Sequence, residues 1–223
     1  MSTDYPRTAS RPVRPDSGSV DLAKNQARTT ASRTRAALLA QYTSNEQAGI
    51  LLRNSFLDSF PLAPGACVSG YWPTSSEIDI RPLMNMLSDR GHPCCMPVVI
   101  NKQQPMRFRQ WTPGVQMVPG RFGIPVPPDT LPEMRPDIVL VPLLAFDRRG
   151  MRLGRGGGLY DRTIELLRAT GKVIAVGISF SGQEVASVPF DVYDQRIDWI
   201  VTESQAFNIN TGYNPLAAFG SLR

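Results

Sequence analysis

The sequence predicts an α/β fold in which helices sandwich a parallel or mixed sheet. Segments with the pattern of strands alternate along the chain with segments of helical pattern, and this alternation is typical of parallel strand pairing. Residues 137–144, DIVLVPLL, are apolar almost throughout, as expected of a strand that is covered on both faces. With 223 residues, 42% of them hydrophobic, the chain is long enough to bury the core of one such domain.

Two helices are expected before the first strand. Asp21 is placed as the N-cap of a helix that runs to about residue 41. Ser44 and Gln47 have the spacing of a capping box and predict a second helix, which ends near residue 60. Residues 66–72, ACVSGYW, then predict a buried strand.

The rest of the chain continues the alternation. A helix is expected from about residue 79, with Gly91 just past its end, and another from about residue 159 to 170, stopped by Gly171. Residues 120–136 are rich in Gly and Pro and are expected to form a loop. The remaining strands are expected at 94–100, 106–111, 137–144, 173–180 and 198–202.

Composition and charge suggest one domain with two tails. Residues 1–20 are rich in Ser, Pro and Arg and are expected to form a disordered basic tail, followed by one domain over 21–205 and a C-terminal tail over 206–223. Of the net charge of +5, a share of +4 lies in residues 1–36, which hold seven Lys or Arg and three Asp. No aromatic residues are interleaved with these basic residues, so nucleic acid is not the expected partner.

Cysteine, histidine and hydropathy exclude further classes. Three cysteines, two of them adjacent, fit neither a disulfide framework nor a zinc-site spacing, and a reducing, cytoplasmic setting is expected. The single histidine, His92, argues against a metal site built from several histidines. The longest apolar run, 138–146, is much shorter than the ~20 residues that a membrane helix needs.

The most informative segment is LGRGGGLYDR, residues 153–162, with four glycines in five positions. Glycine bares the backbone and permits sharp turns, and a glycine loop between a strand and a helix presents free N–H groups to anions at the carboxyl edge of a sheet. Arg152 and Arg155 add donors suited to phosphate, and Asp161 suits a divalent cation that bridges phosphates. The segment therefore predicts a phosphate site; a tight turn with solvated arginines is the alternative. It is neither a Walker A loop, since no Lys-Ser/Thr pair follows, nor a dinucleotide fingerprint, since Leu159 replaces the third glycine.

The wider stretch resembles the signature of the 5-formyltetrahydrofolate cyclo-ligases, also called methenyltetrahydrofolate synthetases. The resemblance rests on four segments in order: KNQAR with the following RAALLA, GYWPTSSEIDIRPL, VPLLAFDRRGMRLGRGGGLYDR and VPFDVYDQRIDWIVTE. It covers roughly residues 22–205. It implies a three-layer α/β/α fold with a mostly parallel sheet, related to the sugar-phosphate isomerase and CoA-transferase group. It also implies ATP, Mg²⁺ and a reduced folate.

The resemblance assigns roles to individual residues. Lys24 and Arg28, four positions apart on one helix face, would reach the ATP phosphates. Arg152 and Arg155 would face the developing phosphate charge as catalytic groups, and Asp161 and Asp194 would bind Mg²⁺. The nucleotide site would also include Leu153, Gly154, Gly156, Gly157, Gly158, Leu159 and Tyr160. The folate site would comprise Trp72, Glu77, Arg155, Gly156, Gly157, Gly158 and Leu159, with Tyr71 either beside it or in the core.

Three positions depart from the family pattern. Leu159 stands in place of a tyrosine, Tyr193 in place of a histidine, and Val126 in place of a glutamate. The expected activity is ATP-dependent cyclisation of 5-formyltetrahydrofolate by a monomer without a membrane partner. Two alternatives remain: a non-catalytic or substrate-altered paralogue that binds nucleotide or folate, and a sugar-phosphate or CoA-type enzyme, for which no catalytic carboxylate motif is found.

Overall fold

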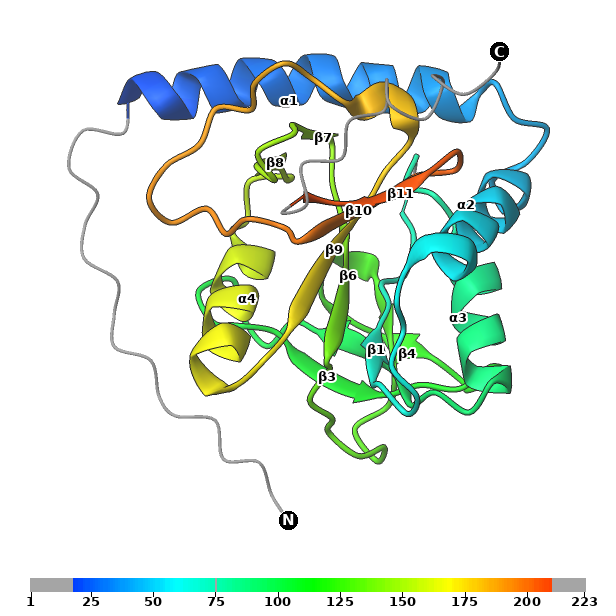
Figure 1. Ribbon diagram of the computed structural model, residues 1–223. Helices are drawn as coiled ribbons and strands as arrows, with labels where there is room; N and C mark the ends of the chain where they lie inside the picture. Colours follow the sequence, from blue (N-terminus) through cyan, green and yellow to red (C-terminus); the bar gives the residue numbers. More distant parts are fainter. Residues whose placement is uncertain (1–17, 75, 210–223) are drawn as a thin grey trace.

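The computed structural model describes residues 18–74 and 76–209, and its centre is a seven-stranded sheet (Figure 1). The five inner strands run parallel, and the two edge strands, β11 and β3, are antiparallel to their neighbours. This arrangement confirms the expected mostly parallel sheet. In spatial order the strands are β11 (Ala206–Asn208), β10 (Trp199–Val201), β9 (Ile174–Ile178), β6 (Ile138–Pro142), β1 (Val68–Ser69), β2 (Cys94–Val98) and β3 (Arg107–Gln110).

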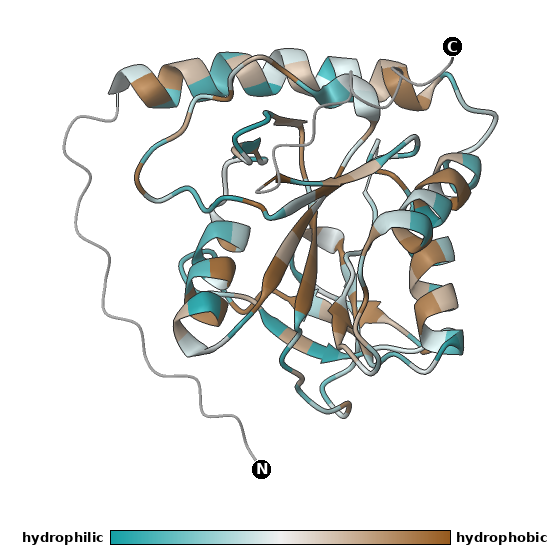
Figure 2. Ribbon diagram, in the orientation of Figure 1, coloured by the Kyte–Doolittle hydropathy of each residue, from teal (hydrophilic) through white to brown (hydrophobic). Residues whose placement is uncertain are grey.

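Helices cover both faces of the sheet, as Figure 1 shows. Helices α2 (Asn45–Ser59) and α3 (Arg81–Asp89) lie on one face and α4 (Leu159–Thr170) lies on the other. Strand β6 contributes side chains to the cores on both faces of the sheet. Ile138 and Leu140 pack in the core beneath α2 and α3, and Val139 and Val141 pack in the core beneath α4. The period of two along a strand explains this division. Figure 2 shows the hydrophobic colouring concentrated along β6 and β9.

Helix α1 (Gly18–Leu39) crosses one end of the sheet. It packs against the short 3-10 helix η2 (Ser181–Gln183) and against β8 (Arg152–Leu153). The expected helix is confirmed, but Asp21 is not its N-cap, since the helix begins at Gly18 and Asp21 lies in its first turn. Residues 18–20, expected in the tail, are thus helical, and the tail residues 1–17 lie outside the described residues. No helix within the described ranges is long and apolar enough to cross a bilayer.

Three predicted helix boundaries, the start of α2 and the ends of α3 and α4, lie at the expected residues. Ser44 caps α2 by accepting a hydrogen bond from the Gln47 N–H at 3.1 Å, although the Gln47 side chain accepts from the Thr43 N–H instead of closing a capping box on Ser44. Gly91, just beyond α3, has a φ of 81°. Gly171 ends α4 as predicted.

Several short elements depart from the predicted strands. Residues 66–72 contain only the two-residue strand β1, and Gly70 beyond it still donates its N–H to the Cys95 carbonyl oxygen at 2.9 Å. The segment 120–136, expected to be a loop, contains the second strand of a small hairpin. The hairpin pairs β4 (Val118–Pro119) with β5 (Pro125–Val126), and the 3-10 turn η1 (Arg121–Gly123) lies at its tip. Strand β11 extends the domain past residue 205, so the boundary expected there falls short of the sheet edge; residues 210–223 lie outside the described part.

Candidate active site

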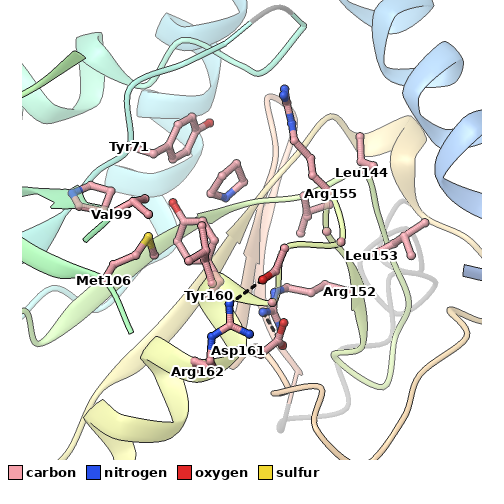
Figure 3. Close-up of a pocket in the computed structure, with 18 of the residues that line it drawn as sticks. Tyr71, Val99, Met106, Leu144, Arg152, Leu153, Arg155, Tyr160, Asp161 and Arg162 are labelled. Atoms are coloured by element: carbon pink, nitrogen blue, oxygen red, sulfur yellow. Dashed lines mark hydrogen bonds and ion pairs between the residues drawn. The ribbon is translucent and has the colours of Figure 1, made fainter. Parts of the chain in front are cut away.

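A cavity of about 830 Å³ lies at the carboxyl end of β6, and residues of α1 line part of it. Its volume is in the range of small-molecule sites, about 300–1,000 Å³. Figure 3 shows Tyr71, Val99, Met106 and Tyr160 toward one side and Leu144, Leu153 and Arg152 toward the other. Every residue that was expected to bind a ligand, act in catalysis or hold a metal lines this cavity: Lys24, Arg28, Trp72, Glu77, Arg152, Leu153, Gly154, Arg155, Gly156, Gly157, Gly158, Leu159, Tyr160, Asp161 and Asp194.

The glycine segment directly follows a β-hairpin that was not predicted from the sequence. After β6, the strands β7 (Ala145–Phe146) and β8 pair antiparallel, and Gly154 follows β8 directly. Gly158, with a φ of 62°, is the N-cap of α4, so the free N–H groups of that helix open toward the cavity. The sequence therefore placed the loop at the correct edge of the sheet but did not foresee the hairpin that carries it.

Two of these glycines have a left-handed backbone and lie close to an arginine side chain. Gly156 has a φ of 99°, and a Cβ there would lie 3.1 Å from Cζ of Arg28. A Cβ on Gly158 would lie 2.7 Å from Nη1 of Arg162. The positive φ at both positions favours glycine, because other residues rarely adopt a left-handed backbone.

Arg152 lines the cavity and is held by two groups, the Asp161 carboxylate and the Gln195 carbonyl oxygen. Its Nη2 donates to Oδ1 of Asp161 at 2.7 Å, and its Nη1 donates to the carbonyl oxygen of Gln195. The same Asp161 oxygen accepts the Gln195 N–H at 3.0 Å. Because its side chain is only 4% exposed, Arg152 presents a fixed charge that is already oriented by the protein.

Lys24 and Arg28 project from one face of α1 into the cavity. The Lys24 ammonium pairs with Oδ2 of Asp191 at 3.0 Å and with Oδ2 of Asp194 at 2.5 Å. Arg28 donates from Nε to the Gly154 carbonyl oxygen at 3.0 Å. The predicted phosphate ligands of α1 therefore reach the glycine segment, and one of them pairs with a predicted metal ligand.

Glu77 lies between two arginines. Its Oε1 is 3.2 Å from Nη2 of Arg155 and 3.6 Å from Nη1 of Arg35. Its Oε2 accepts from both the N–H and the hydroxyl of Thr74 at 2.9 Å. Arg155 also donates to the Thr74 hydroxyl at 2.8 Å, so it ties the glycine segment to the loop that carries Glu77.

Arg35 is the residue of this group that sequence reasoning missed. Burial lowers the pKa of its guanidinium, and the charge of Glu77 opposes that shift. Its signal was present in the sequence, because Lys24, Arg28, Ala31 and Arg35 follow one another at spacings of four, three and four and form one stripe of a helix. Asp191, the second partner of Lys24, was also missed.

The aromatic wall of the cavity consists of neutral side chains. Burial raises the pKa of Tyr71 and of Tyr160, and the nearby charge of Glu77 raises both further. The Tyr71 hydroxyl donates to the Ile78 carbonyl oxygen at 2.9 Å. Trp72 is half-buried, with Arg81 5.6 Å from its ring centroid. The positions that depart from the family pattern, Val126, Leu159 and Tyr193, line the same cavity.

The carboxylates fit a cation that is held jointly with a phosphate. Among residues 18–74 and 76–209 there is no cluster of three or more His, Cys, Asp or Glu side chains that could hold a metal alone. Mg²⁺ is usually bound by one or two carboxylates together with waters and substrate phosphates. Among the described residues, the hydrogen bonds to Asp161 fall on Oδ1 and the close contacts of the Asp194 side chain fall on Oδ2, so in each carboxylate the second oxygen has no partner within that part of the chain.

The model of the 5-formyltetrahydrofolate cyclo-ligase family matches residues 21–203. The chain belongs to this family. Relatives named 5-formyltetrahydrofolate cyclo-ligase include one from Escherichia coli strain K12, 31% identical over 152 residues, which cover 66% of this chain and 83% of that protein. One from Mycolicibacterium smegmatis is 38% identical over 122 residues, which cover 50% of this chain and 61% of that protein.

Solved structures agree with this membership. The 5,10-methenyltetrahydrofolate synthetase of Aquifex aeolicus superposes with a TM-score of 0.68 at 26% identity, over 86% of this chain and 95% of that one. A methenyltetrahydrofolate synthetase from Mycoplasma pneumoniae, at 20% identity and a TM-score of 0.62, shares the fold. Family membership makes the chain an enzyme, a folate cyclo-ligase by reaction class.

Proposed function

We propose that the protein binds ATP and 5-formyltetrahydrofolate in this cavity. It would use the ATP to convert the folate to 5,10-methenyltetrahydrofolate, with release of ADP and phosphate. The observation that supports this proposal most strongly is the convergence of all predicted phosphate and folate residues on one cavity in a chain of this family. A formyl amide oxygen is a poor leaving group. Transfer of the ATP γ-phosphoryl group to that oxygen gives an imidate phosphate, N10 attacks the activated carbon, and phosphate leaves as the ring closes and N10 loses its proton.

The residues at the glycine segment serve the phosphoryl group. The N–H groups at the start of α4, together with Arg152 and Arg155, would bind the oxygens on which negative charge accumulates. Lys24 and Arg28 would bind the remaining phosphates from α1. Such a transfer requires alignment and charge neutralisation more than covalent help, which agrees with a site that relies on arginines and main-chain amides.

The residues on the other side of the cavity orient the folate. Glu77 would accept hydrogen bonds from the amino and ring N–H groups of the pterin, and Trp72 would pack on its face. Arg35, whose Nη1 lies 3.6 Å from Oε1 of Glu77, would orient that carboxylate and so act as a positioning residue. Mg²⁺, when bound between Asp161, Asp194 and the phosphates, would neutralise charge on the nucleotide.

The direct test is the near-ultraviolet absorbance of the methenyl product. Folded protein mixed with 5-formyltetrahydrofolate, ATP and Mg²⁺ should give a rise in absorbance matched by an equal amount of ADP. The β,γ-imido analogue of ATP is the control, since it should bind without giving product. Binding of both ligands by folded protein with no ATP-dependent rise would instead identify a non-catalytic paralogue.

A further inference from the structure

The cavity contains an aspartate that the proposed reaction leaves without a role. Asp191 lies in the segment between η2 and β10, which runs along α1 in Figure 1. It lines the cavity, and its side chain is 18% exposed. Its hydrogen-bond partners include the two residues to which the reaction assigns a phosphate and a metal ion, Lys24 and Asp194. A residue in contact with both is placed to influence how ATP and Mg²⁺ bind together.

Both oxygens of the Asp191 carboxylate accept hydrogen bonds from the protein. Oδ1 accepts the Tyr193 N–H at 2.8 Å, and Oδ2 accepts the Lys24 ammonium at 3.0 Å. The first contact is an Asx turn, in which an aspartate side chain accepts the N–H two residues further along the chain. Because its two oxygens are engaged by two different partners, the carboxylate is held in one orientation, with its charge beside Lys24.

Asp191 also holds Asp194 through the main chain. The Asp191 N–H donates to Oδ2 of Asp194 at 2.7 Å, and the Asp194 N–H donates to the Asp191 carbonyl oxygen at 3.2 Å. The same Oδ2 lies 2.5 Å from the Lys24 ammonium. The turn from Asp191 to Asp194 therefore fixes the carboxylate to which the proposed reaction assigns the metal.

The charges of these three residues do not cancel, because the carboxylates of Asp191 and Asp194 share the single ammonium of Lys24. With Mg²⁺ on Asp194, the attraction between Asp194 and Lys24 would weaken, since a bound metal ion changes the sign of the local charge. The Asp191 carboxylate would then supply the charge that retains Lys24. Without Asp191, Lys24 and Mg²⁺ would compete for one carboxylate.

We infer that Asp191 is a positioning residue, whose carboxylate holds Lys24 beside the nucleotide phosphates so that Asp194 stays available for Mg²⁺. This inference rests on the proposed function and assigns a role to a residue that the function leaves unused. Asp191 acts through Lys24 and Asp194 and not on the substrates themselves. Its effect is to lower the Mg²⁺ concentration that ATP binding requires, while folate binding is unaffected.

The test separates the charge of Asp191 from its turn. In Asp191→Asn, a side-chain oxygen remains for the Tyr193 N–H and the main-chain contacts with Asp194 remain, but the charge beside Lys24 is lost. Asp191→Glu is the complementary variant, since it keeps the charge and lengthens the side chain. Asp129→Asn, the same change at an exposed acid that does not line the cavity, is the matched control.

The measurement is calorimetric binding of the β,γ-imido analogue of ATP at a series of Mg²⁺ concentrations. Asp191→Asn should raise the Mg²⁺ concentration for half-maximal binding by roughly fivefold, the upper end for an ion pair in contact with solvent. At saturating Mg²⁺, the affinity for the analogue should return close to that of the wild type. Asp191→Glu should lie closer to the wild type than Asp191→Asn does, and Asp129→Asn should match the wild type. Asp191→Asn should change neither thermal stability nor the KM for 5-formyltetrahydrofolate.

A role in the turn alone makes the opposite prediction. It would leave the Mg²⁺ curve of Asp191→Asn like that of the wild type and impair Asp191→Glu, and this result would overturn the inference. A change confined to the KM for the folate, or no Mg²⁺-dependent binding of the analogue by the wild type, would overturn it as well. The binding experiment needs no turnover, so it is distinct from the test of the reaction: the predicted shift in a protein that forms no methenyl product would contradict the proposed reaction and support the role of Asp191.

Discussion

The Lys24 ammonium lies 2.5 Å from Oδ2 of Asp194 and 3.0 Å from Oδ2 of Asp191, so one cation of α1 bridges two acids that follow it by more than 160 residues. The lysine side chain is only 6% exposed. In the proposed function, Lys24 would bind a nucleotide phosphate and Asp194 would bind the accompanying Mg²⁺. This ion pair joins the predicted phosphate ligand to the predicted metal ligand.

Lys24→Met should therefore weaken ATP binding strongly. The change removes an ammonium from the phosphate site and leaves Asp191 and Asp194 to repel the nucleotide, so the KM for ATP should rise by at least about tenfold, the factor for a loss of about 1.4 kcal/mol. Initial rates across an ATP titration measure this effect. Asp194→Asn is the matched control, since it retains Lys24 and should chiefly raise the Mg²⁺ requirement. An unchanged KM for ATP in Lys24→Met would contradict the assignment.

Glu77→Gln should separate the folate side of the cavity from the nucleotide side. Glutamine keeps the shape but loses the charge that pairs with Arg35 and Arg155. Because hydrogen bonds to charged groups contribute about 1.5–3 kcal/mol, the KM for the folate should rise by about tenfold or more. The KM for ATP should stay near that of the wild type. A selective rise in the KM for ATP would place the folate elsewhere.

Asp161→Asn should raise the Mg²⁺ concentration that gives half-maximal rate. Asparagine still accepts the Gln195 N–H, so the turn is retained, but the carboxylate charge beside the phosphates is lost. The measurement is a Mg²⁺ titration at saturating ATP. Arg152 loses its partner in the same variant, so Glu165→Gln, a substitution on the same helix at a residue that does not line the cavity, controls for the loss of an acid on α4. Identical Mg²⁺ curves for wild type and Asp161→Asn would reject the metal role.

The sequence predicted most of the fold because its signals were local. Period-two alternation, the Ser44 cap and the terminal glycines mark helices and strands wherever they occur. Where tertiary packing sets a boundary, prediction fell short. The apolar run 138–146 does not show that β6 ends at Pro142 and that Ala145 and Phe146 belong to a second, small sheet.

In the candidate site, too, local features could be predicted and contacts between distant residues could not. The glycine segment could be predicted from residue type and spacing, whereas the role of Lys24 and Arg28 was expected only from the family resemblance. The partners of those residues could not, since Asp191 lies 167 positions from Lys24 and Glu77 meets Arg155 only after the sheet has formed. Asp147 was missed for another reason: an acid in a loop resembles a solvated residue until its buried hydrogen bonds are known.

Asp147→Asn tests how the β7–β8 hairpin, and with it Arg152, is held. The Asp147 side chain is 1% exposed and accepts hydrogen bonds from the N–H groups of Arg149, Met151 and Val188 and from the Arg149 guanidinium. Burial acts to raise the pKa of Asp147, but the hydrogen bonds from Arg149, Val188 and Met151 outweigh it and hold the pKa below its ordinary value of 3.8. Asparagine turns an N–H₂ group toward these donors, so unfolding free energy should fall by about 3 kcal/mol at neutral pH.

The same shift fixes the pH dependence of this loss. A carboxylate whose pKa is lower in the folded state stabilises the protein above its unfolded-state pKa, and that stability disappears as the pH falls through the folded-state pKa. The difference in unfolding free energy between wild type and Asp147→Asn should therefore be constant from neutral pH to about pH 5 and shrink below about pH 4. Urea unfolding followed by tryptophan fluorescence at each pH measures it. A difference that does not shrink in acid would show that the carboxylate charge contributes nothing, and that shape alone positions the hairpin.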